Sequence, residues 1–316
     1  TLPVAYLNSD IIHSDGDGTQ ENPYVINSSS NDKPDISYGE NNLVKQILIK
    51  KNVDDATYDR DTGGEVFAFE HVANDVARAS TDYRYIGESP NNYITFDNET
   101  FRIIGVFEDE RGVKRAKIVR NNHLVHCGDS GWSWTDYGVT KTNFENTNMY
   151  KKALKRAISD GAMEHVDEMQ YYMGGITSLN QSVENIYNEE RTSSNLPFDF
   201  VSNVKAGIPY MSDFFYTYGK GVNDTCYLNV SQCNPGSYSN SWLYNGRVLP
   251  FMNISRSSAK FYQLSYGVSE IDGTSSNEVR EVLYLKPDTI SLCGDGSQDN
   301  PYVIESHDSR DTISSL

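Results

Sequence analysis

A segment of 22 residues occurs twice in this chain, once near each end, and this duplication constrains the architecture more than any other feature. Residues 5–26 read AYLNSDIIHSDGDGTQENPYVI and residues 283–304 read LYLKPDTISLCGDGSQDNPYVI, so 13 positions are identical at a constant offset of 278. Both copies contain a short apolar run, a Gly-Asp-Gly corner and an Asn-Pro-Tyr-Val-Ile run. Glycine adopts the positive φ angles of tight corners, and proline keeps the preceding residue extended. The sequence therefore predicts a strand, a corner and a second strand in each copy.

Two architectures explain such a duplication, and the sequence leaves both open. In the first, residues 1–26 are the end of a preceding module in a head-to-tail array, whose period far exceeds the roughly 20 to 50 residues of solenoid repeats. In the second, they are a donor strand that occupies another subunit's slot by strand addition. The side chains expected to make the assembly contacts are Leu2, Val4, Tyr6, Leu7 and Ile12, with Tyr284, Leu285 and Ile290 in the second copy.

The charge balance excludes several partner classes. The 316 residues include 27 Lys and Arg against 44 Asp and Glu, a formal net charge of -17. This balance argues against nucleic acid or an anionic membrane surface as the partner. No apolar run approaches the roughly 18 residues of a membrane span, and no secretory signal opens the sequence. We therefore expect a mature or trimmed extracellular domain that does not insert into a membrane.

The four cysteines suggest local cross-linking. Cys226 and Cys233 bracket a short polar segment, so we expect them to form a disulfide in an oxidising compartment. Cys127 and Cys293 are a second candidate pair, and buried free thiols are the alternative.

Residues 27–40 are rich in Ser, Asn, Asp and Pro and are interpreted as a linker. The apolar pattern of residues 42–49 fits a helix or a buried strand equally well, and that of residues 65–80 fits a short helix. Four apolar runs between residues 83 and 119 then predict a meander of consecutive hairpins.

Helices are predicted next, over residues 149–160, 163–173 and 181–189, and Gly161 is expected to end the first of them. The remainder returns to short strands and loops, closing on the strand at residues 282–285. The order of these elements predicts the α+β class.

A series of short motifs follows in order between about residue 80 and residue 304. They are DYRYIG (82–87), PNNYI (90–94), FRIIGV (101–106), YYMGG (171–175), IY (186–187), ER (190–191), GIPYMSD (207–213), Cys226 with Cys233, SWLYN (241–245), SRSS (255–258) and VREVLYL (279–285). This series resembles a Tyr-, Asn- and Ser-rich family of surface modules in Gram-positive bacteria, whose fold is similar to the C-type lectin fold. The chain departs from the family pattern at Phe101, where Trp is common, at Glu281, where Pro is common, and over residues 247–254.

The resemblance implies a cellular location and an architecture, but it carries no agreed catalytic residues. It implies a C-type-lectin-like module over residues 41–304, with antiparallel sheets and two or three short helices, followed by a polar tail over residues 305–316. It also implies a secreted or wall-associated protein in which such modules are often repeated.

No metal or cofactor is predicted. Residues 15–19, Asp-Gly-Asp-Gly-Thr, carry oxygen ligands of the kind calcium prefers, but the EF-hand spacing fails, because Gln20 stands at position 6 and Ile26 at position 12. A turn is the favoured interpretation, with calcium as a minor alternative. His123, His126, Cys127 and Asp129 do not match a zinc spacing, so polar residues at a strand end are favoured there.

Enzyme activity is not predicted. The chain has no Gly-x-Ser-x-Gly elbow. Formylglycine-generating enzymes share the C-type-lectin-like fold and use two copper-binding thiols, but Cys226 and Cys233 are better explained as a disulfide, and a shared fold alone does not imply activity.

Sugar binding would require an aromatic platform, because the loop motifs of calcium-dependent lectins are missing from the sequence. The candidate rings could stack on a sugar, although such clusters are more often core. They are Trp132, Trp134 and Tyr137, and the cluster Phe214, Phe215, Tyr216 and Tyr218.

Two functional hypotheses follow. The first is a structural module of a bacterial surface protein, filament or pilus-like assembly, joined head to tail through its duplicated ends to copies of itself or to adjacent modules. The second is an adhesin module that binds a host glycan or protein through the loops of residues 121–145 and 212–247.

Overall fold

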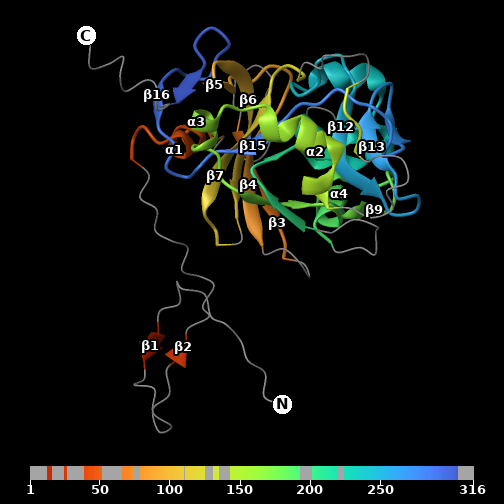
Figure 1. The fold of residues 1–316 in the computed structure, drawn as a ribbon, viewed down its shortest axis with the longest axis horizontal. Helices are drawn as coiled ribbons and strands as arrows, with labels where there is room; N and C mark the ends of the chain where they lie inside the picture. The colour runs from red at the N-terminus through yellow and green to blue at the C-terminus, as the bar shows by residue number, and fades with distance from the viewer. Residues whose placement is uncertain are drawn as a thin grey trace. The chain divides into compact units, whose positions relative to one another are not determined.

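The computed structural model describes residues 13–15, 25–26, 39–51, 66–73, 79–109, 111–124, 131–134, 143–192, 201–219 and 224–304. The chain forms two compact units, residues 1–36 and residues 37–316, and their boundary falls within the segment interpreted as a linker. In the first unit, β1 (His13–Asp15) pairs antiparallel with β2 (Val25–Ile26). The second unit is mostly sheet with short helices, which confirms the α+β class (Figure 1). Among the helices described, none has the length and apolar character needed to cross a membrane.

Within the described residues, nine strands of the second unit form one sheet, in the order β11-β15-β7-β6-β5-β17-β16, with β4 attached to β6 and β3 to β4. The strands are β3 (Val66–His71), β4 (Ser80–Tyr85), β5 (Tyr93–Phe96), β6 (Glu99–Glu108), β7 (Lys114–Arg120), β11 (Ala206–Gly207), β15 (Val282–Tyr284), β16 (Ser291–Cys293) and β17 (Tyr302–Ile304).

The meander exists, but one of its predicted hairpins does not. β7 pairs along one edge of β6, while β5 and β4 share the other edge, β5 beside its first half and β4 beside Gly105 and Val106. The consecutive pairing of β4 with β5 was therefore the wrong expectation. Gly105 permits the close approach of β4 to β6, because a Cβ there would collide with the Tyr83 carbonyl of β4.

Residues 65–80 were expected to form a short helix, and this prediction is wrong. β3 is a strand that pairs with β4 over its whole length, from Val66 opposite Tyr85 to His71 opposite Ser80. Long-range strand pairing overrides the local pattern here. The ambiguous residues 42–49 form a helix, α1 (Leu43–Leu48), because the Asn42 side chain caps it by accepting from the Lys45 N–H.

The predicted helix over residues 149–160 is broken into α2 (Asn148–Lys152), η2 (Leu154–Arg156) and α3 (Asp160–Met163). The first break falls at Ala153, between α2 and η2. The start of α3 is set by Ser159, whose hydroxyl accepts from the Ala162 N–H and so begins a new helix at the place where Gly161 was expected to end one.

The helix predicted over residues 163–173 is also wrong. Residues 169–172 form β8 (Met169–Tyr172), which pairs antiparallel with β10 (Val201–Val204). The helix predicted over residues 181–189 is confirmed as α4 (Val183–Glu190). Sequence patterns missed the helical region that follows, which comprises α5 (Met211–Phe215), η3 (Tyr216–Tyr218), α7 (Asp224–Leu228), η4 (Val230–Gln232) and η5 (Pro235–Asn240).

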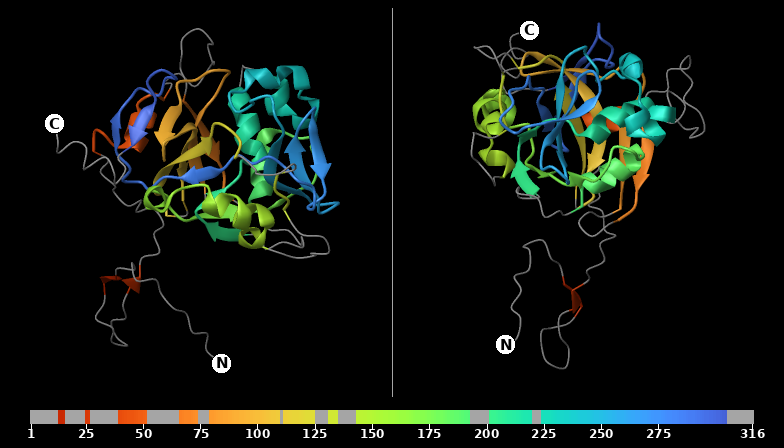
Figure 2. Two further views of the ribbon diagram at one scale, coloured as in Figure 1. Left: turned by 45° about the horizontal axis from the view of Figure 1, so that its top comes forward. Right: turned by 90° about the vertical axis from the view of Figure 1, so that its right-hand side faces the viewer.

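A second sheet in the described part has the order β14-β13-β12-β9, with β12 and β9 parallel. Figures 1 and 2 show β12 and β13 at the opposite end of this unit from α1 and β16. One hydrophobic core collects buried side chains from both sheets and from the helices between them. The strands are β9 (Gly175–Ile176), β12 (Leu249–Ser255), β13 (Phe261–Leu264) and β14 (Val268–Ile271).

Candidate assembly site

The two copies of the duplicated segment form hairpins with the same register. In the first copy His13 lies opposite Ile26 and Asp15 opposite Val25. In the second copy Ser291 lies opposite Ile304 and Cys293 opposite Val303, which are the same positions at the offset of 278. Each hairpin has its register irregularity between these two pairs. The expected strand, corner and strand are present in the second copy; in the first copy the paired strands β1 and β2 are described, and the corner between them lies outside the described residues.

The C-terminal hairpin extends the large sheet. β17 pairs in parallel with β5, with Tyr302 opposite Ile94 and Val303 opposite Thr95, so β16 lies at the edge. The corner is also bonded to β5, because the Tyr93 N–H donates to the Gly296 carbonyl at 2.7 Å.

Lys50 fastens the corner further. Its ammonium group donates to the carbonyl oxygens of Asp295 and Asn91, and it also lies over the Tyr302 ring, 5.1 Å from the centroid. Gly296 has φ +84°, and a Cβ there would collide with the Asn91 carbonyl. The corner thus requires glycine for both conformation and space.

The first arm of the hairpin contacts the residues around α1. The Leu43 N–H donates to the Thr289 carbonyl at 2.9 Å, and the Ser291 N–H donates to the Asn41 carbonyl at 2.8 Å. The Asn42 amide donates to the Pro287 carbonyl at 2.7 Å, and Figure 1 shows α1 beside β16. The hairpin takes part in all three contacts through main-chain groups, so they depend little on which side chains the hairpin carries.

The strand that precedes the hairpin lies inside the sheet. β15 pairs with β7 on one side and β11 on the other, and Leu283 lies between Ile118 and Ala206. We call residues 280–304 the closing segment. We call the surface that receives it, formed by β5, β7, β11 and residues 41–50, the slot.

The predicted assembly residues of the second copy occupy this slot. Tyr284 and Leu285 are buried, whereas Ile290 is 41% exposed. The Tyr284 ring meets Phe107 and Tyr171 edge-on at 6.1 and 5.8 Å between centroids. The counterparts Leu2, Val4, Tyr6, Leu7 and Ile12 lie outside the described residues.

Two charged side chains of the closing segment are buried. The Glu281 carboxylate pairs with the Arg120 Nε at 2.7 Å, and the Arg280 guanidinium donates to the carbonyls of Arg120 and Leu243 at 2.8 and 2.6 Å. Burial raises the pKa of Glu281 to about 7, although Arg120 opposes this shift. Burial also lowers the pKa of Arg280 to about 9, with a contribution from nearby Arg102. Charges at these positions depend on their partners in the slot.

Nearby, a buried ionic cluster joins the sheet to α5. Arg84 bridges Asp82 at 2.7 Å and Asp213 at 3.1 Å, and the Lys117 Nζ lies 2.6 Å from Asp213. Burial would raise the pKa of Asp213, but Lys117 and Arg84 outweigh it and hold that pKa below its ordinary value. Burial lowers the pKa of Lys117 to about 8, against the pull of Asp213. The cluster fixes β4, β7 and α5 together, and sequence patterns did not reveal it.

Most of the candidate ligand-binding rings are in the core. Trp134, Phe214, Phe215, Tyr216 and Tyr218 are each at most 1% exposed, so they cannot form the platform that the recognition hypothesis required. The Trp134 ring stacks on Phe261 with 4.0 Å between centroids. The rings are buried because α5 and η3 pack within the hydrophobic core.

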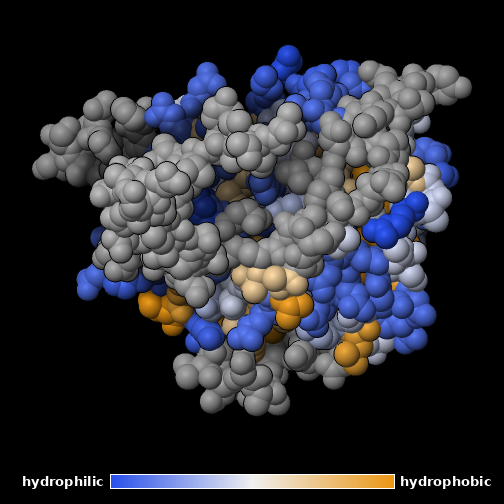
Figure 3. Space-filling model, turned by 90° about the horizontal axis from the view of Figure 1, so that it is seen from below, coloured by the Kyte–Doolittle hydropathy of each residue, from blue (hydrophilic) through white to orange (hydrophobic). Residues whose placement is uncertain are grey.

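The other two ring candidates do not complete a platform. Trp132 is partly buried and pairs with Asn277 through a β-bridge, and Tyr137 lies outside the described residues. Figure 3 shows hydrophobic residues on one face as separate spots rather than one broad patch. The exposed large hydrophobic side chains in the described part are Ile49, Val72, Leu228, Tyr266, Ile290 and Leu292.

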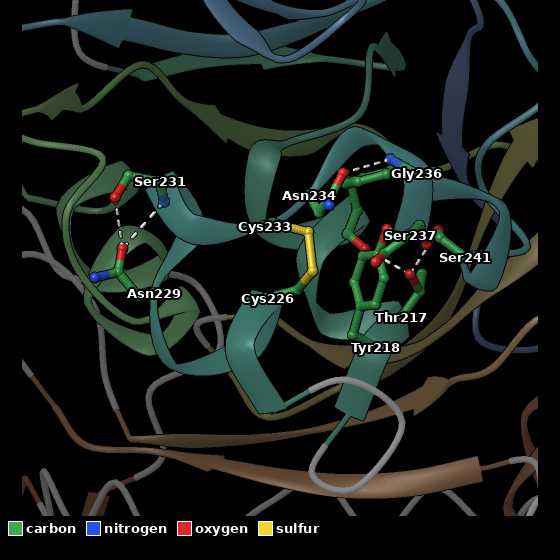
Figure 4. The surroundings of a disulfide bond; sticks show 11 residues. Thr217, Tyr218, Cys226, Asn229, Ser231, Cys233, Asn234, Gly236, Ser237 and Ser241 are labelled. Atoms are coloured by element: carbon green, nitrogen blue, oxygen red, sulfur yellow. Dashed lines mark hydrogen bonds between the residues drawn. A yellow bond between two sulfur atoms is a disulfide. The ribbon is translucent and has the colours of Figure 1, made fainter.

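The Cys226–Cys233 disulfide is present, as the spacing predicted (Figure 4). It ties α7 to the residue after η4. Neighbouring turns are held by the Tyr218 hydroxyl, which donates to the Ser237 carbonyl at 3.2 Å. Cys293 has a free, exposed thiol on the edge strand β16, so the second expected pair is not formed. Cys127 lies outside the described residues.

No group of three or more potential metal-ligating side chains occurs in the part of the chain that the structure describes. In the C-terminal corner, the Asp295 carboxylate accepts from the Ser297 N–H at 2.8 Å, and this bonding to Ser297 lowers the Asp295 pKa. His123 contacts the Val248 carbonyl at 3.1 Å. The side chains of residues 15–19, and residues 126–129, lie outside the description.

Comparison with known proteins yields no relative. No protein-family model matches the chain, no curated protein matches it, and no solved structure matches it.

Proposed function

We propose that this chain is a structural module of a bacterial cell-surface protein or pilus-like filament, in which the duplicated end segments join neighbouring modules head to tail. One observation carries this proposal. The first and second copies form hairpins with the same register, and the second copy completes a sheet by pairing with β5. A segment that completes one module of this fold is chemically suited to complete another.

The joining mechanism is strand addition. Main-chain hydrogen bonds to both neighbours of the added strand supply affinity, and alternate buried side chains supply register. In the closing segment, β15 has both neighbours, and Val282, Leu283 and Leu285 are fully buried. An arrangement of this kind gives a mechanically continuous joint without a separate adaptor.

Two further features support a location outside the cell. The Cys226–Cys233 disulfide fits an oxidising compartment, and the net charge of -17 favours solubility over contact with anionic surfaces. The resemblance to Gram-positive surface modules with a C-type-lectin-like fold agrees with this location. The recognition alternative gains no support, because five of its seven candidate rings are buried.

Antibodies raised against the folded chain test the proposal on the source organism. We expect immunogold particles on intact, unpermeabilised cells. We also expect the antigen, after native extraction of the cell surface, in species larger than one module. Labelling that requires permeabilised cells would contradict the location. An antigen that migrates only at the size of a single module, in both denaturing and native extracts, would contradict head-to-tail joining.

A further inference from the structure

The slot of this module is already filled by the module's own closing segment. β15, β16 and β17 are all paired within the large sheet, and α1 and Lys50 hold the hairpin. The chain also carries the first copy of the segment, extended here to residues 2–26. Among its described residues, the second unit has no further slot of this kind for that copy. The first copy therefore needs a slot on another module.

The two copies agree at positions that shape the backbone and the general core. Val282, Tyr284 and Leu285 are buried in this module and correspond to Val4, Tyr6 and Leu7. The corner and second arm agree as well: Gly296, Tyr302 and Ile304 are buried and correspond to Gly18, Tyr24 and Ile26. The first copy is therefore built for a slot of the same fold.

The copies differ at five buried positions of the closing segment. Two of them are Thr289 and Ser291, which correspond to Ile11 and His13, and the other three make the most specific contacts with this slot. Arg280, Glu281 and Leu283 correspond to Leu2, Pro3 and Ala5. Each of the three second-copy side chains is at most 1% exposed. Conservative differences at exposed positions, such as Glu21 in place of Asp299, should not change how well a copy fits this slot.

These three differences make the first copy a poor occupant of this slot. With proline at the position of Glu281, the buried Arg120 would lose its 2.7 Å carboxylate partner and keep only the more exposed Glu99. A buried charge left without its partner is strongly unfavourable. Alanine in place of Leu283 would leave a void between β7 and β11.

The loss of Arg280 adds to this mismatch. Leucine cannot donate to the Arg120 and Leu243 carbonyls, which Arg280 satisfies at 2.8 and 2.6 Å in the interior. Buried carbonyls without a donor carry a desolvation penalty. Each of the three positions therefore disfavours an identical copy as the acceptor.

We infer that residues 2–26 close the sheet of a second, non-identical module of the same fold. Its slot is apolar where this module has Arg120, and it carries extra side-chain volume opposite Ala5. This inference rests on the proposed function and narrows it, because it names the partner as a sister module rather than a second copy of this chain. Selectivity arises because buried charges and volumes match within each pair.

Refolding of the full chain tests the inference, because every slot is then open to competition. We compare the wild-type chain with the triple variant Leu2→Arg, Pro3→Glu, Ala5→Leu, whose first copy carries the three residues of the second. After unfolding and refolding over a range that reaches roughly the millimolar effective concentration of an intramolecular segment, light scattering on a size-exclusion column should show monomer with at most a trace of oligomer for the wild type. The triple variant should give at least tenfold more oligomer at the highest concentration. The changed residues lie outside the unit of residues 37–316, which limits their effect on its folding.

The matched control is Asn8→Lys, Glu21→Asp, which changes two positions whose counterparts, Lys286 and Asp299, are exposed. It should remain monomeric. Oligomer in equal amount for the wild type and the triple variant would overturn the inference, because the three positions would then not decide the partner.

A second measurement does not depend on oligomer formation. Fluorescent peptides of residues 1–26, with the wild-type or the triple-variant sequence, are added in excess while the full chain refolds. We expect at least tenfold more capture of the triple-variant peptide. Equal capture of the two peptides, including capture of neither, overturns the inference. The surface-labelling result stands apart from both measurements, so failure of the proposed function remains distinguishable.

Discussion

Gly296 and Gly246 show two separate reasons why a corner can require glycine, a positive φ angle and a lack of space for a Cβ. Both have positive φ, +84° and +79°, but a Cβ at Gly296 would meet the Asn91 carbonyl, whereas a Cβ at Gly246 would meet nothing within 4 Å. The conformational cost is therefore shared, and the steric cost belongs to Gly296. At this scale the sequence was informative, because the Gly-Asp-Gly pattern predicted the corner before any contact was known.

We expect Gly296→Ala to destabilise the chain more than Gly246→Ala. The left-handed conformation costs roughly 1 to 2 kcal/mol for a residue with a Cβ, and both variants should lose about this amount of unfolding free energy. Gly296→Ala should lose more, because the hairpin must shift away from Asn91. Urea denaturation measures both variants. Equal losses would show that the corner is not held against residue 91.

Glu281 makes the free energy of unfolding depend on pH. Its pKa of about 7 in the folded chain lies above the ordinary 4.5, so between these values the folded chain retains a proton that the unfolded chain has released. The free energy of unfolding therefore falls as pH rises through this window, by about 3 kcal/mol. Glu281→Gln should remove this contribution to the pH dependence of the unfolding free energy.

The comparison isolates Glu281, because other titrating groups are common to both proteins. His123, whose pKa is lowered by burial, contributes with the opposite sign in each. The comparison variant is Glu99→Gln, at a more exposed carboxylate that also contacts Arg120. The charge of Glu99 is a minor contribution to the raised pKa of Glu281, so this variant should reduce the pH dependence of the unfolding free energy less than Glu281→Gln does. Parallel pH profiles for the wild type and Glu281→Gln would show that Glu281 is ionised throughout.

At the scale of elements, prediction succeeded where local chemistry decides and failed where distant partners decide. The cap at Asn42 selects a helix for residues 43–48, and α4 follows its own pattern. β3 and β8, by contrast, were read as helices because their pairing partners lie elsewhere in the chain. Composition favoured the core for the aromatic residues of the run 214–218 but left a surface platform open, and the packing of α5 and η3 shows that they are core.

The disulfide is an element-scale constraint with a measurable effect. Cys226 and Cys233 are separated by seven residues in sequence. Closing a loop of this length stabilises the folded chain by about 2 to 3 kcal/mol in the chain-entropy account. The double variant Cys226→Ser, Cys233→Ser should lose about this amount in urea denaturation, and a reductant should bring the wild type to the same midpoint.

Cys293→Ser is the control for that measurement. The Cys293 thiol is free and exposed, so its removal should leave the midpoint unchanged under oxidising conditions. A wild-type chain whose midpoint does not respond to reductant would show that the bridge does not contribute to stability.

At the scale of the whole molecule, the closing segment is an integral part of the second unit. It supplies an interior strand, three of the nine strands described in the large sheet, and the carboxylate that neutralises Arg120. The duplication was visible in sequence, but the slot was not. Asn41 and Tyr93 contact the hairpin through a main-chain carbonyl and a main-chain N–H, and the Lys50 ammonium group donates to a main-chain carbonyl of the hairpin, so no side-chain pattern of the hairpin reports these contacts.

Because the slot is full, the first copy should not change the association state of the isolated chain. We expect the full chain and a variant lacking residues 1–26 both to be monomeric by light scattering on a size-exclusion column, with the same thermal midpoint. An intramolecular segment competes at a high effective concentration, so an equal or weaker intermolecular one cannot displace it at ordinary protein concentrations. Concentration-dependent oligomers of the full chain alone would show that its first copy enters the slot of an identical chain. Such a result would make the protein self-polymerising and would remove the need for a sister module.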